Sequence, residues 1–143
     1  MSTTERLRRG LDRITPGGWY VREEKPVRIP DFDEPEPDLA VVRGDIEDYE
    51  KAPPGPADVA LLIEVSDSTL PWHRGTKRAV YARSAIPIYW IVNLLERQIE
   101  VYTGPAPEGY QKCRIYTASE TLPVIVDGQE IGQLPIAQIL PGL

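Results

Sequence analysis

The chain has 143 residues, 41% of them hydrophobic and 27% charged, which is typical of one soluble globular domain and excludes a wholly disordered protein. The formal net charge of −6 disfavours a protein that coats nucleic acid without sequence preference, because such binding needs an excess of Lys and Arg. One Cys and one His exclude an internal disulfide and a Cys/His zinc site. No stretch reaches the length of a membrane span and the N-terminus lacks the apolar core of a signal peptide, so we expect a cytoplasmic protein with no membrane partner.

The N-terminal third predicts one helix followed by short extended segments. Ser2 and Glu5 have the spacing of a capping box, and apolar residues recur at helical spacing from Leu7 to Ile14, so we expect a helix over residues 1–15. Short strands or a hairpin are expected over residues 19–23 and 27–29, a further strand over 39–42 and a helical turn within 43–51.

The middle of the chain predicts a buried strand and a helix. Residues 59–65 are continuously apolar apart from Glu64, which suits a strand covered on both faces. With a period of two, Val59 shares a face with residues 61, 63 and 65, and Ala60 shares the other with residues 62, 64 and 66. Ser68 or Thr69 can cap a helix that runs to about Arg83.

The last third predicts short strands separated by Gly and Pro turns. They are expected over residues 88–92, 98–103, 110–116 and 122–126. The order of helix, strands, helix and strands predicts an α/β or α+β fold with a mixed sheet flanked by helices and additional C-terminal strands. We expect one domain over residues 1–143, with its core at about 19–126.

Glu64 is the residue that most needs an explanation. A buried carboxylate without a partner is costly, so it must bind a cation or change its pKa. Asp38 precedes a neighbouring strand, and Lys77 follows on the predicted helix, where it shares a face with His73 and Tyr81 at spacings of four. Mg²⁺ accepts one or two carboxylates plus waters and phosphate oxygens, so Asp38 and Glu64 suffice for a metal-dependent phosphodiesterase site.

A series of motifs between Pro37 and Tyr102 resembles the Uma-two family of bacterial proteins described as restriction endonucleases. In chain order they are Pro37-Asp38 with Leu39-Ala40-Val41-Val42, Leu62-Ile63-Glu64-Val65-Ser66, Arg74-Gly75-Thr76-Lys77, Tyr81-Ala82, Ile86-Pro87 and Tyr89-Trp90-Ile91-Val92. This family belongs to the PD-(D/E)xK nuclease superfamily. The resemblance therefore implies the restriction endonuclease-like fold and an endonuclease that hydrolyses DNA.

The resemblance also implies roles for particular residues. Asp38 and Glu64 would be catalytic and would bind Mg²⁺ or Mn²⁺, together with the backbone carbonyl of Val65. Lys77 would replace the usual strand lysine, because Ser66 stands two positions after Glu64. The residues with accessory or DNA-binding roles would be His73, Ser66, Arg74 and Arg78.

Two features depart from the family pattern. His73 stands where the family often has an aspartate before the arginine of the helix motif, and the N-terminal segment is shorter than usual. A homodimer is expected, because one small domain offers little surface for gripping a DNA duplex.

Structural interpretations remain open for the same residues. Glu64 could be a structural carboxylate paired with Lys77 or with an arginine, Asp38 a solvated turn residue, and Ser66 and Asp67 caps of the following helix. Two other functions also remain open. One is a catalytically inactive nuclease-fold module for binding or assembly, and the other is a metal-dependent hydrolase of a small phosphoester.

Overall fold

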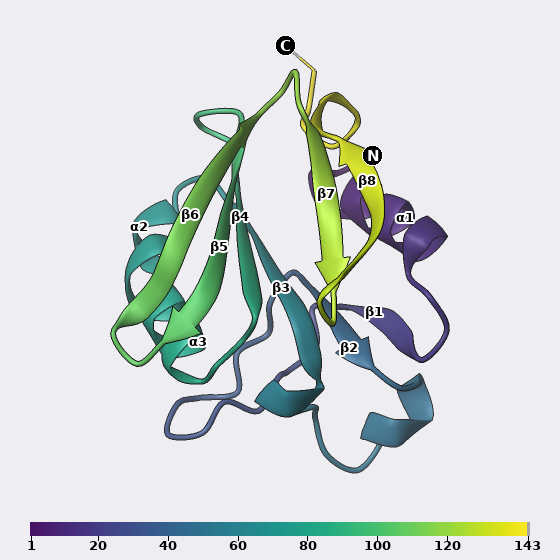
Figure 1. Cartoon of the computed structure of the whole chain (residues 1–143), viewed down its shortest axis with the longest axis vertical. Helices are drawn as coiled ribbons and strands as arrows, with labels where there is room; N and C mark the ends of the chain where they lie inside the picture. Colours follow the sequence, from purple (N-terminus) through teal and green to yellow (C-terminus); the bar gives the residue numbers. More distant parts are fainter. Residues whose placement is uncertain (143) are drawn as a thin grey trace.

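The computed structural model describes residues 1–142 and shows a six-stranded mixed sheet with a separate two-stranded hairpin on one side (Figure 1). The order in the large sheet is β1-β2-β3-β4-β5-β6, and β7 pairs with β8. The strands are β1 (Trp19–Glu23), β2 (Leu39–Arg43), β3 (Val59–Ser66), β4 (Ile88–Asn93), β5 (Gln98–Ala106), β6 (Gly109–Thr117), β7 (Thr121–Val126) and β8 (Gln129–Pro135).

Within residues 1–142 only β3 and β4 are parallel, and every other pair of neighbouring strands is antiparallel. A parallel pair needs a crossover connection, and here the crossover is the helical segment between Ser66 and Ile88. This segment consists of α2 (Leu70–Trp72), a π-helical turn (His73–Lys77) and α3 (Arg78–Arg83). The predicted mixed sheet flanked by helices is confirmed.

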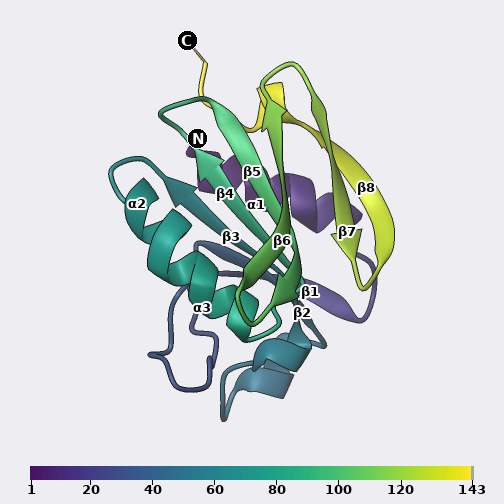
Figure 2. The same ribbon diagram turned by 60° about the vertical axis from the view of Figure 1, so that its left-hand side comes forward.

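Helix α1 (Thr3–Ile14) and the β7–β8 hairpin cover one face of the sheet (Figures 1 and 2). The predicted capping box forms, with Ser2 and Glu5 side chains each accepting from the other's backbone N–H. Leu7 and Leu11 are fully buried in a cluster that also contains Leu134 and Ile136. The buried core therefore takes residues from both ends of the chain, outside the range 19–126.

The helical crossover covers the opposite face, as Figure 2 shows for α2 and α3. Apolar side chains of the crossover pack on β3, β4 and β5 through a second buried cluster that includes Leu70, Val80, Tyr81, Leu62 and Tyr89. None of the helices within residues 1–142 is long and apolar enough to cross a membrane. The sheet is thus covered on one face by α1 and the β7–β8 hairpin and on the other by the helical crossover.

Two local predictions are wrong. Residues 27–29 form no strand, because the N–H groups of Val27 and Arg28 donate to the carbonyls of Pro35 and Pro54 rather than to a strand ladder. The register of β2 against β3 shifts at Val41 and Val42, so Val59 and Ala60 exchange the faces that strict alternation predicts.

The C-terminal part is longer than the sequence pattern indicates. Strand β8 and a short 3₁₀ turn, Ile136–Gln138, extend the ordered chain beyond residue 126. The helical turn expected within residues 43–51 is present as a 3₁₀ turn, Ile46–Tyr49. A second 3₁₀ turn, Pro56–Asp58, leads into β3.

Candidate active site

Glu64 lies on the helix-covered face of β3 with only 2% of its surface exposed. Three side chains from the crossover segment converge on its carboxylate. Lys77 Nζ donates to Oε2 at 2.7 Å and Tyr81 Oη donates to the same oxygen at 3.4 Å. His73 Nε2 lies 3.9 Å from Oε1. The shared helix face predicted from the spacing of these residues is therefore confirmed.

Asp38 and Glu64 are joined by two reciprocal hydrogen bonds between β2 and β3. The backbone N–H of Asp38 donates to Oε1 of Glu64 at 3.3 Å, and the N–H of Val65 donates to Oδ2 of Asp38 at 2.6 Å. Because Leu39 pairs with Ile63, Asp38 enters β2 directly beside Glu64. The structure thus brings together the two carboxylates that the sequence singles out, so Asp38 is not a free turn residue.

Burial disfavours the charged form of both carboxyl groups. It raises the pKa of Glu64 above its ordinary value, and this effect outweighs the opposing charge and hydrogen bond of Lys77. Burial also raises the pKa of Asp38, and the neighbouring Glu64 charge adds to it, although the Val65 N–H acts in the opposite direction. The fold therefore brings two carboxyl groups close together in surroundings that disfavour the negative charge on both, and the neighbouring donors offset this only in part.

His73 is buried, and its Nδ1 is hydrogen-bonded to the hydroxyl of Ser66. Burial and the charge of Lys77 lower the pKa of His73 to about 4, so the imidazole is neutral at pH 7. The Ser66 hydroxyl bonds to His73 and does not cap the following helix, so the prediction that Ser66 caps it is wrong. The side chain of Asp67 does not cap the helix either, because its carboxylate accepts from the N–H and the hydroxyl of Ser68.

The crossover is not a regular α-helix. Its central turn, His73–Lys77, is π-helical, and Thr69 occupies the N-cap position without a side-chain cap bond. Tyr89 Oη donates to the backbone carbonyl of His73 at 3.2 Å. Single π-helical turns often occur at functional sites. Here the turn contains both His73 and Lys77, which contact Glu64.

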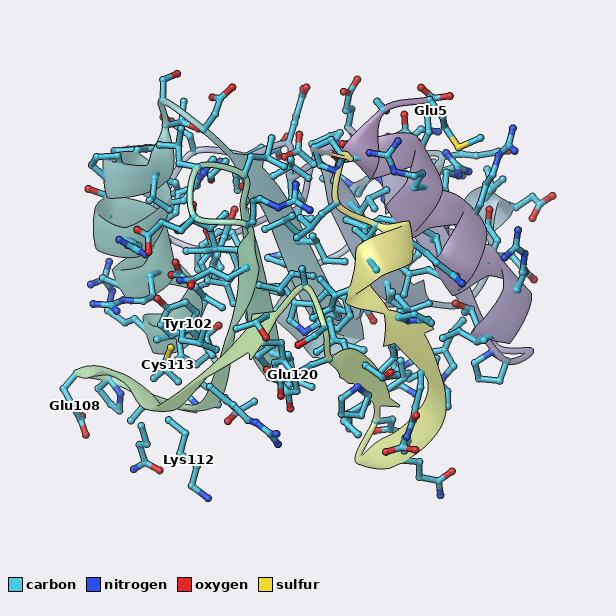
Figure 3. The ribbon with its side chains drawn as sticks, turned by 90° about the horizontal axis from the view of Figure 1, so that it is seen from above. Glu5, Tyr102, Glu108, Lys112, Cys113 and Glu120 are labelled. Carbon is cyan, nitrogen blue, oxygen red and sulfur yellow. The ribbon has the colours of Figure 1, made fainter. Side chains whose placement is uncertain are left out.

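A second buried carboxylate, Glu100 on β5, lies on the same side of the sheet and has 1% of its surface exposed. It accepts hydrogen bonds from Arg74 Nε at 3.0 Å, Tyr102 Oη at 2.7 Å and Asn93 Nδ2 at 3.1 Å, and a further one from the Arg74 guanidinium. Burial raises the pKa of Glu100, but these donors outweigh it and leave the pKa below its ordinary value. Tyr102 lies on the side of the molecule that carries the crossover (Figure 3).

Sequence reasoning missed Glu100. Its neighbours Ile99 and Val101 are apolar, which is the same signal that drew attention to Glu64. However, a charged residue that alternates with apolar ones is also typical of a strand with one solvated face. Glu100 also bears on the DNA-binding role predicted for Arg74, because the guanidinium of Arg74 is already bound to the Glu100 carboxylate. Arg78 is exposed and places its guanidinium 5.2 Å from the centre of the Tyr102 ring.

The donor chemistry of the Glu64 centre fits Mg²⁺ or Mn²⁺. Across residues 1–142, no three His, Cys, Asp or Glu side chains are grouped to hold a metal ion by themselves. Mg²⁺ does not require such a group, since it is held in many proteins by one or two carboxylates together with waters and phosphate oxygens. Val65 bonds to Oδ2 of Asp38 and leaves Oδ1 to take another partner.

Comparisons with known proteins agree with the fold. A model of the Uma2 family, described as "Putative restriction endonuclease", matches residues 3–136. A crystal structure of a protein from Anabaena variabilis ATCC 29413, described as "a putative nuclease belonging to DUF820", superposes with a TM-score of 0.67 at 14% identity. The match covers 96% of this chain and 77% of that one. No functionally curated protein shows significant similarity to the chain.

Proposed function

The chain belongs to the Uma2 family, and we propose that it is a metal-dependent endonuclease that hydrolyses DNA phosphodiester bonds with Mg²⁺ or Mn²⁺. One observation carries the proposal: the carboxylates of Asp38 and Glu64 each accept a backbone N–H from the segment that carries the other, and the ammonium of Lys77 donates to Glu64. Two carboxylates and one ammonium group suffice for metal-assisted phosphodiester hydrolysis.

Asp38 and Glu64 would hold the metal, and the backbone carbonyl of Val65 is a third ligand in the proposal. When bound, the ion neutralises the scissile phosphate and lowers the pKa of the attacking water. The raised pKa of both carboxyl groups means that protons compete with the metal for them. We therefore expect metal binding to weaken as the pH falls.

Lys77 is proposed to orient the attacking water and to stabilise charge that develops on the phosphate. Its side chain is 13% exposed, so it is held by Glu64 and still reaches the surface of the site. His73 is proposed as an accessory group. Because its imidazole is neutral at pH 7, it does not compete with the metal as a second cation. Ser66 fixes the orientation of its ring.

The test is cleavage of single-stranded and duplex DNA with Mg²⁺ or Mn²⁺. We expect Asp38→Asn, Glu64→Gln and Lys77→Met each to abolish cleavage or reduce it strongly. Asp33→Asn is the matched control, because Asp33 is an exposed carboxylate of the same loop. Cleavage that all three site variants retain at the wild-type rate would refute the proposal.

A second function, a catalytically inactive binding or assembly module, is supported by a different observation. Lys77 already neutralises Glu64 without a metal, and the net charge of −6 opposes DNA binding. Calorimetry separates the two functions. No heat of binding with millimolar Mg²⁺ or Mn²⁺, together with a stable homodimer by light scattering, would favour the module.

A further inference from the structure

Glu100 and Glu64 occupy one row across the sheet. Glu64 pairs with Ile91 on β4, and Ile91 pairs with Glu100 on β5, so the two carboxylates flank the same residue on the helix-covered face. Neighbouring strands lie about 4.8 Å apart, which places the two strands about 10 Å from each other. Arg74 contacts one carboxylate and Lys77 contacts the other. The π-helical turn is thus attached to the sheet at two points.

The π-helical turn depends on such attachments. A π turn is rarer than an α turn, so tertiary contacts must hold it in place. If the turn returned to α-helical geometry, the residues on its two sides would rotate relative to each other by roughly one residue, or about 100°. His73 and Lys77 lie at the two ends of this turn. Residues four apart share a face in an α-helix as well, so the π turn does not decide whether the two side chains share a face. It sets how the two parts of the crossover are rotated relative to each other and to Glu64, and Arg74 holds that turn.

We propose that Glu100 is a positioning residue for the Glu64 site: through Arg74 it holds the π-helical turn, and the turn keeps His73 and Lys77 against Glu64. This inference rests on the proposed function in so far as the site binds a metal. Glu100 does not touch the proposed metal or substrate. Its buried carboxylate accepts hydrogen bonds from four donor atoms, including Asn93 Nδ2 and Tyr102 Oη on the sheet itself, so it forms a fixed point on the sheet.

The structure supplies a matched pair of variants. Arg74 faces two glutamates, the buried Glu100 and Glu96, whose side chain is 56% exposed and lies 3.8 Å from the guanidinium. Glu100→Gln removes the charge from the buried partner, and Glu96→Gln makes the same change at the exposed one. Arg74→Lys keeps the positive charge but loses the planar fork that binds Glu100 through two nitrogens. It provides a second variant if Glu100→Gln does not fold.

Two measurements on the full-length protein are needed. The first is the ¹⁵N spectrum of the imidazole, which is unambiguous because His73 is the sole histidine. The second is the dissociation constant for Mn²⁺ by calorimetry. In folded Glu100→Gln we expect the Nδ1 and Nε2 resonances to move from their wild-type positions and the dissociation constant to rise about 10- to 100-fold, as for other groups that orient metal ligands. Glu96→Gln should match the wild type in both.

The outcomes separate positioning from a merely structural role. If Glu100→Gln and Arg74→Lys fold and lower the melting temperature, yet keep the wild-type histidine spectrum and Mn²⁺ affinity, the inference is overturned. An equal effect of Glu96→Gln would also overturn it. If the wild type binds no Mn²⁺, the metal-dependent function fails, but the histidine spectrum still decides whether Glu100 positions the turn.

Discussion

The two buried carboxylates, Glu64 on β3 and Glu100 on β5, face the same helical segment but have opposite electrostatic settings. Glu100 accepts from two guanidinium nitrogens, one amide and one phenol, and its pKa lies below the ordinary value. Glu64 accepts one short bond from the Lys77 ammonium and two longer ones, at 3.3 Å from the Asp38 N–H and at 3.4 Å from the Tyr81 hydroxyl. Its pKa lies above the ordinary value.

The difference separates a carboxylate with a full set of hydrogen-bond donors from one without. Glu100 has a full set of donors in the protein, so another cation would have to displace Arg74. Glu64 has weaker support and a second carboxylate, Asp38, beside it, so an added cation would relieve repulsion that the fold leaves in place. Burial alone therefore does not distinguish the two carboxylates, whereas the balance of donors around each does, and it supports the proposal that Glu64 rather than Glu100 binds a metal.

The largest expected effect is a loss of folding stability, and we expect it to be larger at Glu100 than at Glu64. Glu100→Ala should lower the free energy of unfolding by about 3–4 kcal/mol, because it breaks a buried charged network and leaves a cavity. Glu64→Gln should change it by less than about 1 kcal/mol, since it removes a carboxylate whose charged form the fold disfavours. Urea unfolding at pH 7 without metal measures both. Equal losses of stability at the two positions would contradict the difference proposed between Glu100 and Glu64.

The sequence predicted the Glu64 centre better than the Glu100 centre. The spacing of His73, Lys77 and Tyr81 placed them on one helix face, and the single charge in an apolar strand identified Glu64. Both rest on local periodicity, which a sequence shows directly. Glu100 could not be assigned in the same way, because whether β5 is covered on that face depends on the crossover and not on β5 itself.

The sequence analysis also did not predict two irregularities of the backbone. The register shift opposite Val59 and Ala60 and the π turn at His73–Lys77 each displace the chain by one residue from a regular pattern. Such shifts are stabilised by partners far away in the chain, as Arg74 and Glu100 show. Strand β8 was missed for a similar reason, because it pairs only with β7 and its sequence has few β-branched residues.

The next effect is a pH dependence that tests the neutral state of His73. Its pKa is about 4 in the folded protein against 6.5 ordinarily, so between these values the unfolded chain binds more protons. This contribution to stability is present above pH 6.5 and is lost as the pH falls towards 4, and it amounts to about 3 kcal/mol. The raised pKa values of Asp38 and Glu64 act in the opposite direction, since their contribution is lost as the pH rises.

The variant His73→Gln isolates the histidine contribution, because no other histidine is present. Unfolding free energies of wild type and variant should be measured between pH 4 and 7 without metal. We expect the wild type to lose about 3 kcal/mol more than the variant over this range. Parallel curves for the two proteins would mean that His73 titrates normally and does not lie in the buried environment beside Glu64.

A smaller effect is expected at Ser66, whose hydroxyl bonds to the imidazole from the fully buried end of β3. Ser66→Ala should cost about 1–2 kcal/mol, because it leaves a buried ring nitrogen without its main partner. Thr69→Ala is the control, since the Thr69 hydroxyl lies at 3.4 Å from the same nitrogen and its side chain is exposed. A similar loss in both variants would show that Ser66 has no special role in orienting His73.

The smallest effect distinguishes the two arginines of the crossover in DNA binding. Arg78 is exposed beside the Tyr102 ring, whereas Arg74 is bound to Glu100. In a Glu64→Gln background that prevents cleavage, Arg78→Ala should weaken DNA binding a few-fold and reduce the slope of log K against log salt concentration by about 0.9, as expected for one lost phosphate contact. Arg83→Ala, at an exposed position of α3 one to two turns away, provides the comparison. If Arg78→Ala leaves the salt slope unchanged, Arg78 stacks on Tyr102 without contacting phosphate, and the DNA surface must lie on another element.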